Sequence, residues 1–125
     1  MKRTLIGLSL ILIAVIALSA CNSRTEQPVD QQKMIDQGRQ VYLEYCAECH
    51  QVNGTGWSTL YPRLAGNPIV TLHDPEPVIL TVKYGQGSMM SFSTKLTSEQ
   101  IAAVISYIRN AWGNQAPAVS TKQIN

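Results

Sequence analysis

Residues 46–50 read Cys46-Ala47-Glu48-Cys49-His50, near the middle of a chain of 125 residues. The stretch places two thiols three positions apart and an imidazole directly after the second thiol. Few sites in proteins use this order of side chains, so the pentapeptide is the most specific signal in the sequence.

Four kinds of site contain two cysteines at this spacing. A redox-active C-x-x-C of the thioredoxin type expects a βαβ setting, which the sequence lacks. A zinc site needs four ligands, and only His73 remains as a donor once Cys21 is assigned elsewhere. A structural disulfide between Cys46 and Cys49 is possible but leaves His50 without a role. Attachment of a c-type haem uses all three residues, because each thiol can add to a vinyl group while His50 ligates the iron.

The start of the chain has the pattern of an export signal. Lys2 and Arg3 precede the apolar run LIGLSLILIAVIALSA at 5–20, which is shorter than the roughly 20 residues of a membrane-spanning helix. Leu18-Ser19-Ala20-Cys21 resembles the lipobox of bacterial lipoproteins, in which the cysteine is lipidated and becomes the first residue. An ordinary signal or an uncleaved anchor is the alternative. We therefore expect signal peptide 1–20 and an extracytoplasmic protein, anchored through Cys21 to the periplasmic face, or the outer face of the plasma membrane, of a bacterium.

Composition excludes one large class of function. The formal charge is +2, but without Lys2 and Arg3 the chain has eight basic and eight acidic residues. No basic cluster interleaves with aromatic residues, so a nucleic-acid partner is not expected. The three cysteines divide into one for lipid and two for haem.

The rest of the chain predicts one small all-α domain. The polar segment 22–33 is expected to be a flexible tether after Cys21, 34–114 the domain, and 115–125 a tail that is disordered or laid on the surface. No alternating strand pattern occurs, and three helices are expected.

Each expected helix has its own local signal. The first has apolar residues at helical spacing from Met34 to Tyr45, with Asp30 as a possible N-cap. The second covers EPVILTVKY at 76–84 and stops at Gly85. The third follows a capping box of Thr97 and Gln100. Its apolar face comprises Ile101, Val104, Ile105, Ile108 and Trp112.

Further residues make 34–114 similar to the class I c-type cytochromes. Gly38 and Tyr42 precede Cys46 in the pattern G-x-x-x-Y-x-x-x-C. The resemblance implies three main helices around one covalently bound haem. It also implies that Gly38 permits a close crossing with the last helix, where Tyr107 is the partner aromatic. Otherwise Gly38 is only a weak point in a helix.

The resemblance also implies the remaining site residues. In YPRLAG at 61–66, the carbonyl of Pro62 would accept a hydrogen bond from His50, unless Pro62 only makes a surface turn. In GQGSMMSF at 85–92, the family pattern M-P-x-F places Met89 on the iron. Met90 stands where proline is usual, so Met90 is a second candidate and a vacant or histidine-ligated site a third. His73 is expected to be an exposed loop residue.

Four more side chains are weaker candidates, as donors of hydrogen bonds to the haem propionates. Ordinary packing or a solvent-facing position explains each of them equally well: Trp57, Tyr61, Arg63 and Tyr84. The blocks YPRLAGNPIV and SYIRNAWGN are similar to cytochrome domains that serve periplasmic dehydrogenases and terminal oxidases. The expected function is a monomeric or complex-bound electron carrier, not an enzyme, working between protein redox partners. The alternatives are a fixed relay subunit of an oxidase or dehydrogenase, and a haem peroxidase or gas sensor with a labile Met89.

Overall fold

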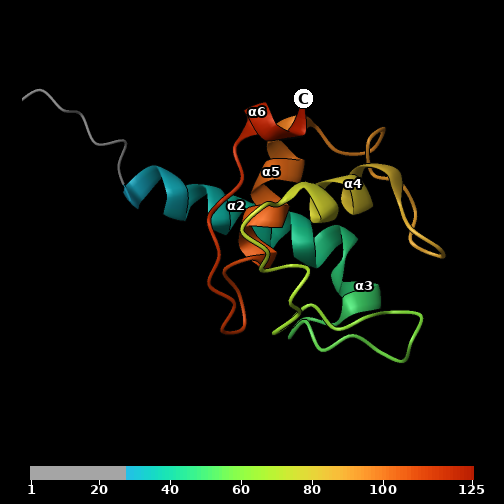
Figure 1. The fold of residues 1–125 in the computed structure, drawn as a ribbon. Coiled ribbons are helices and arrows are strands. Elements are labelled where there is room, and N and C mark those ends of the chain that lie inside the picture. The colour runs from blue at the N-terminus through green and yellow to red at the C-terminus, as the bar shows by residue number, and fades with distance from the viewer. Residues whose placement is uncertain (1–27) are drawn as a thin grey trace, which may run out of the picture.

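The computed structural model describes residues 28–125. The expected signal peptide, Cys21 and the first part of the expected tether lie outside the described residues. The helices are α2 (Pro28–Tyr45), α3 (Ala47–His50), α4 (Glu76–Tyr84), α5 (Ser98–Ile108) and α6 (Thr121–Ile124) (Figure 1). Between residues 28 and 125 the backbone forms two isolated β-bridges and no strand. The all-α prediction is confirmed. None of the helices in this part of the chain is long and apolar enough to cross a membrane.

The core forms where α2 crosses α5 (Figure 1). A Cβ atom at Gly38 would overlap the carbonyl group of Ala103 and lie 2.9 Å from the Cβ atom of Tyr107. The rings of Tyr42 and Tyr107 pack with their centres 5.3 Å apart. The expected close crossing at Gly38 is therefore present, because the missing side chain lets the two backbones touch.

Local capping chemistry sets the ends of α4 and α5. Glu76 donates its backbone N–H to Asp74 Oδ1 (3.0 Å) before α4, and Gly85 ends that helix at φ 79°. Thr97 and Gln100 form the predicted capping box of α5. The four predicted core positions within α5 are all buried: Ile101, Val104, Ile105 and Ile108.

The first helix begins earlier than the sequence predicted. It starts at Pro28, so residues 28–33 of the expected tether are helical and Asp30 lies in the first turn instead of at the N-cap. Proline is well tolerated in a first helical turn, and an acidic side chain there is favoured by the helix dipole. Residues 30–33 are exposed, which is why they show no apolar period.

Two predictions near the C-terminus are wrong. Helix α5 ends at Ile108, and Trp112 follows it at φ 54°, packing against Tyr42 and Tyr107 instead of extending the helix face. The segment 115–125 is neither disordered nor merely laid on the surface. It runs back beside α5 (Figure 1) and buries Val119 and Ile124. Because its apolar residues are spread over an extended stretch and the single turn of α6, they show no periodicity.

Candidate functional site

A cavity of about 200 Å³ lies among α3, α4, α5 and the loops 61–70 and 85–92. We call it the inner cavity; its walls are mostly apolar, and Cys46, His50 and Met89 line it. It continues into an outer cleft of about 520 Å³, which adds Cys49 and Met90. The structure thus brings together residues that are up to about forty positions apart in the sequence.

His50 is the last residue of α3 and is 8% exposed. Its Nδ1 atom lies 2.9 Å from the carbonyl oxygen of Pro62. Because a carbonyl oxygen only accepts hydrogen bonds, Nδ1 carries the hydrogen, and the neutral form of the ring then has a free lone pair on Nε2. The backbone holds the residue at both ends, since its N–H donates to Cys46 and its carbonyl accepts from Gly56, both at 2.9 Å. The ring is therefore oriented to bind a metal through Nε2.

The loop that carries Pro62 is fixed by backbone hydrogen bonds to the segment after His50. The carbonyl of Gly54 accepts from the N–H groups of Leu64 (2.8 Å) and Ala65 (2.9 Å). Gly54 in turn lies under the ring of Trp112, whose Nε1 donates to the carbonyl of Val52 at 3.1 Å. Trp112, in the segment that follows α5, thus supports the turn that presents the Pro62 carbonyl.

Sequence reasoning missed the buried side chain of Asn114, which lies in a segment without a pattern. Its Nδ2 donates to the carbonyls of Ile108 (2.7 Å) and Leu64 (3.1 Å), and its Oδ1 accepts from the N–H of Gly66 at 2.7 Å. Asn114 therefore joins α5 to the loop that holds Pro62. These partners lie up to 50 positions away, so no local signal could have found them.

The two thiols of the motif are free. The backbone N–H of Cys49 donates to the carbonyl of Cys46 at 3.2 Å, which places both residues on one helical turn. Burial, with a smaller effect from Cys49, raises the pKa of the Cys46 thiol to about 12. No disulfide joins the pair, and within residues 28–125 no three His, Cys, Asp or Glu side chains gather as a metal site.

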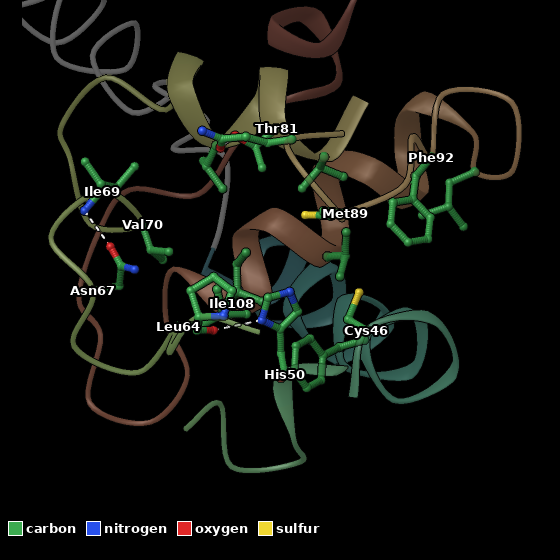
Figure 2. Close-up of a pocket in the computed structure, with 17 residues that line it drawn as sticks. Cys46, His50, Leu64, Asn67, Ile69, Val70, Thr81, Met89, Phe92 and Ile108 are labelled. Carbon is green, nitrogen blue, oxygen red and sulfur yellow. Dashed lines mark hydrogen bonds between the residues drawn. The ribbon is translucent and has the colours of Figure 1, made fainter. Parts of the chain in front are cut away.

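Met89 and Met90 occupy different environments. The Met89 side chain is partly buried, packs against the core and lines the inner cavity. Figure 2 shows it entering this cavity opposite the His50 ring, with Cys46 at the edge. Met90 is 57% exposed, and its sulfur accepts a hydrogen bond from Lys95 Nζ at 3.2 Å. The geometry favours Met89 over Met90 as the thioether that faces His50.

The loop 85–92 is anchored although it lacks the usual proline. Gln86 and Met89 exchange two backbone hydrogen bonds, of 3.1 and 2.9 Å. Further on, Ser91 Oγ donates to the carbonyl of Lys83 at 2.6 Å, and the Phe92 N–H donates to the carbonyl of Val82 at 3.1 Å. These contacts close the turn that carries Met89 and tie the far end of the loop to α4.

The weaker candidates fall mostly outside the site. Tyr61 lines the outer cleft. Trp57 is 70% exposed and stacks on Tyr61 with ring centres 6.3 Å apart. Arg63 donates through Nε to the carbonyl of its near neighbour Ala65, and Tyr84 is exposed. None of Trp57, Arg63 and Tyr84 lines the inner cavity or the outer cleft. His73 is exposed in its loop, as predicted.

This set of residues fits a c-type haem. A buried imidazole with a free Nε2 faces a thioether across an apolar cavity, and two unpaired thiols stand on the adjoining helical turn. Apolar walls suit the faces of a porphyrin, and the donors are those expected for histidine–methionine ligation of haem iron.

Comparison with known proteins finds similarity to cytochrome c proteins and cytochrome subunits. The family model described as cytochrome C oxidase, cbb3-type, subunit III, matches residues 33–108. Cytochrome c-552 of Thermus thermophilus is 37% identical over 92 residues, which are 62% of this chain and 69% of the relative. The cytochrome c subunit of the quinone alcohol dehydrogenase of Gluconobacter oxydans (strain 621H) is 36% identical over 91 residues, 64% of this chain.

The gluconate 2-dehydrogenase cytochrome c subunit of Pantoea cypripedii is 34% identical over 97 residues, 67% of this chain. The dehydrogenase subunits are much longer proteins. The match covers 19% of the alcohol dehydrogenase subunit and 22% of the gluconate dehydrogenase subunit, so this chain spans about a fifth of each.

Proposed function

Because the chain belongs to the cytochrome c family described as cbb3-type oxidase subunit III, we propose that it carries single electrons between protein redox partners outside the cytoplasm. The observation that carries the proposal is the orientation of His50 by the Pro62 carbonyl, toward a cavity that Met89 enters from the other side. Haem, when bound, supplies a one-electron Fe(III)/Fe(II) couple.

The motif residues have separate roles in this proposal. Cys46 and Cys49 hold one haem through thioether bonds, since the chain contains one C-x-x-C-H pattern. His50 binds the iron through Nε2, and Met89 binds it through sulfur. The hydrogen bond from His50 Nδ1 to Pro62 fixes the ring and makes Nε2 a stronger donor.

Two features of the chain favour the reduced form. A thioether ligand stabilises Fe(II) more than a second imidazole does. The apolar walls of the inner cavity also disfavour the additional positive charge of Fe(III). We therefore expect a reduction potential above that of a bis-histidine haem protein.

The anchored loop 85–92 supports a carrier over the alternative of a peroxidase or gas sensor. Hydrogen bonds on both sides of Met89 hold it at the cavity, so His50 and Met89 would both bind the iron of a haem held there and would leave no open site for small ligands. The test is addition of carbon monoxide to the reduced protein at neutral pH. An unchanged spectrum supports the carrier, whereas ready binding would favour the sensor or peroxidase.

The surface beside the outer cleft is the proposed docking face. Leu60 (62% exposed) and Met90 (57% exposed) lie at this face. Of the residues between 28 and 125, Glu48 is the one charged residue that lines the cleft. Since residues 34–112 contain five basic and six acidic side chains, a ring of lysines does not form here. A small apolar contact suits a brief redox encounter.

We propose a membrane-bound dehydrogenase or terminal oxidase as the partner, reached from a lipid anchor on Cys21. Relatives with matching domains are named as cytochrome subunits of alcohol and gluconate dehydrogenases and of a cbb3-type oxidase. Purification of the full lipidated chain in mild detergent tests whether the protein is a free carrier or a fixed subunit of a complex. Isolation as a monomer that dehydrogenase-containing membranes reduce would support a free carrier, and co-purification with partner chains in fixed ratio would support a relay subunit.

A further inference from the structure

Arg109, the residue that follows α5, is completely buried. Its Nε donates to the carbonyl of Pro117 at 2.9 Å, and its Nη1 donates to the carbonyl of Val70 at 2.8 Å. Its Nη2 is buried with no hydrogen-bond partner within residues 28–125. A buried charge is costly unless an opposite charge pairs with it, and both of these acceptors are neutral.

The guanidinium lies directly behind the wall of the inner cavity. Val70, whose carbonyl it holds, and Ile108, which precedes it in the chain, both line that cavity. Asp74 is exposed and opposes the lowering of the Arg109 pKa that burial causes. Arginine remains protonated in proteins even so. A fixed positive charge is therefore present one residue layer from the proposed haem.

Resting on the proposed function, we propose that Arg109 is a positioning residue that raises the reduction potential of the haem through its buried positive charge. Fe(III) haem carries one more positive charge than Fe(II) haem, so a nearby fixed cation disfavours the oxidised form. In the protein interior the interaction is far less screened than it is in water. Exposed basic residues, in contrast, are screened by solvent and salt.

The test compares three substitutions in the haem-loaded protein: Arg109→Met, Arg109→Gln and Arg109→Lys. Removing the charge with Met or Gln should lower the equilibrium constant for reduction by on the order of tenfold, which is 59 mV for a one-electron couple. The Lys variant keeps the charge at acid pH, where its ammonium is protonated, and should keep the potential there. It should unfold more easily, because it loses the planar fork that holds two carbonyls. The exposed Arg39→Gln is the matched control and should leave the potential unchanged.

Optical titration gives the potential, and the sulfur-to-iron absorption band shows whether the axial ligands are intact. The inference is overturned if a neutral variant keeps both the band and the original potential. It is also overturned if the Lys variant loses as much potential as the Met variant at acid pH, where the ammonium is charged, because the effect would then be structural. The Gln variant retains a donor for the Val70 carbonyl and supplies the comparison if the Met variant does not fold. Failure of the proposed function looks different, since the unmodified chain would then bind carbon monoxide readily or hold no haem.

Discussion

Gly38 in α2 and Ala103 in α5 touch through their backbones, so closely that a side chain at position 38 would overlap the Ala103 carbonyl. The next residue in α5, Val104, lines the inner cavity, as does Ile108 one turn later. The helix crossing therefore determines where one wall of the proposed haem site lies.

Replacing Gly38 with Ala should destabilise the protein by about 1–3 kcal/mol, because the added methyl group pushes α2 and α5 apart. Alanine is the better helix former by about 1 kcal/mol, so a stabilised variant would contradict the close crossing. Urea unfolding measures the difference. The neighbouring exposed Gln37→Ala is the control and should stay within about 0.5 kcal/mol of the original protein.

Replacing Met89 with Ala should abolish the sulfur-to-iron absorption band of the oxidised protein and lower its reduction potential. The drop should be on the order of tenths of a volt, since axial ligands set haem potentials over about 0.8 V. Met90→Ala is the matched control and should keep the band, because Met90 is exposed and bonded to Lys95. Loss of the band in the Met90 variant alone would show that the two methionines had been assigned in the wrong order.

Replacing Val119 with Ala should cost about 2 kcal/mol of stability, because its side chain is fully buried against α5. The same substitution at Val52, which is 62% exposed, should change stability by less than about 0.5 kcal/mol. Equal effects at the two positions would mean that the C-terminal segment does not pack on the core in solution. Thermal unfolding of the haem-loaded protein provides the comparison.

Replacing Cys21 with Ser should move the haem-containing protein from the membrane fraction to the soluble fraction of the cell envelope. Serine lacks the thiol that takes the lipid, so the variant carries no acyl chains there. Stable anchoring needs at least two acyl chains. Fractionation followed by a haem stain measures the change. Retention of the Ser variant on membranes would contradict lipid anchoring.

Features of the fold that depend on neighbouring residues could be predicted from the sequence. Features that depend on contacts between distant segments could not. The Thr97–Gln100 capping box lies within one helical turn and could be predicted from four residues. Asn114 and Arg109 each also bond a distant backbone group, 50 and 39 positions away, which spacing cannot reveal. The proposed ligands Met89 and His50 were assigned from motifs, but only the fold shows that they enter one cavity.

The central claim is that Cys46 and Cys49 hold one haem covalently, with His50 as a ligand. Intact mass spectrometry of the protein, produced in cells that attach c-type haem and then unfolded in acid, tests it most directly. We predict a mass equal to the processed chain plus one haem, and loss of that addition in the Cys46→Ala, Cys49→Ala double variant. A chain without the added mass, or an addition that survives in the double variant, would contradict the account.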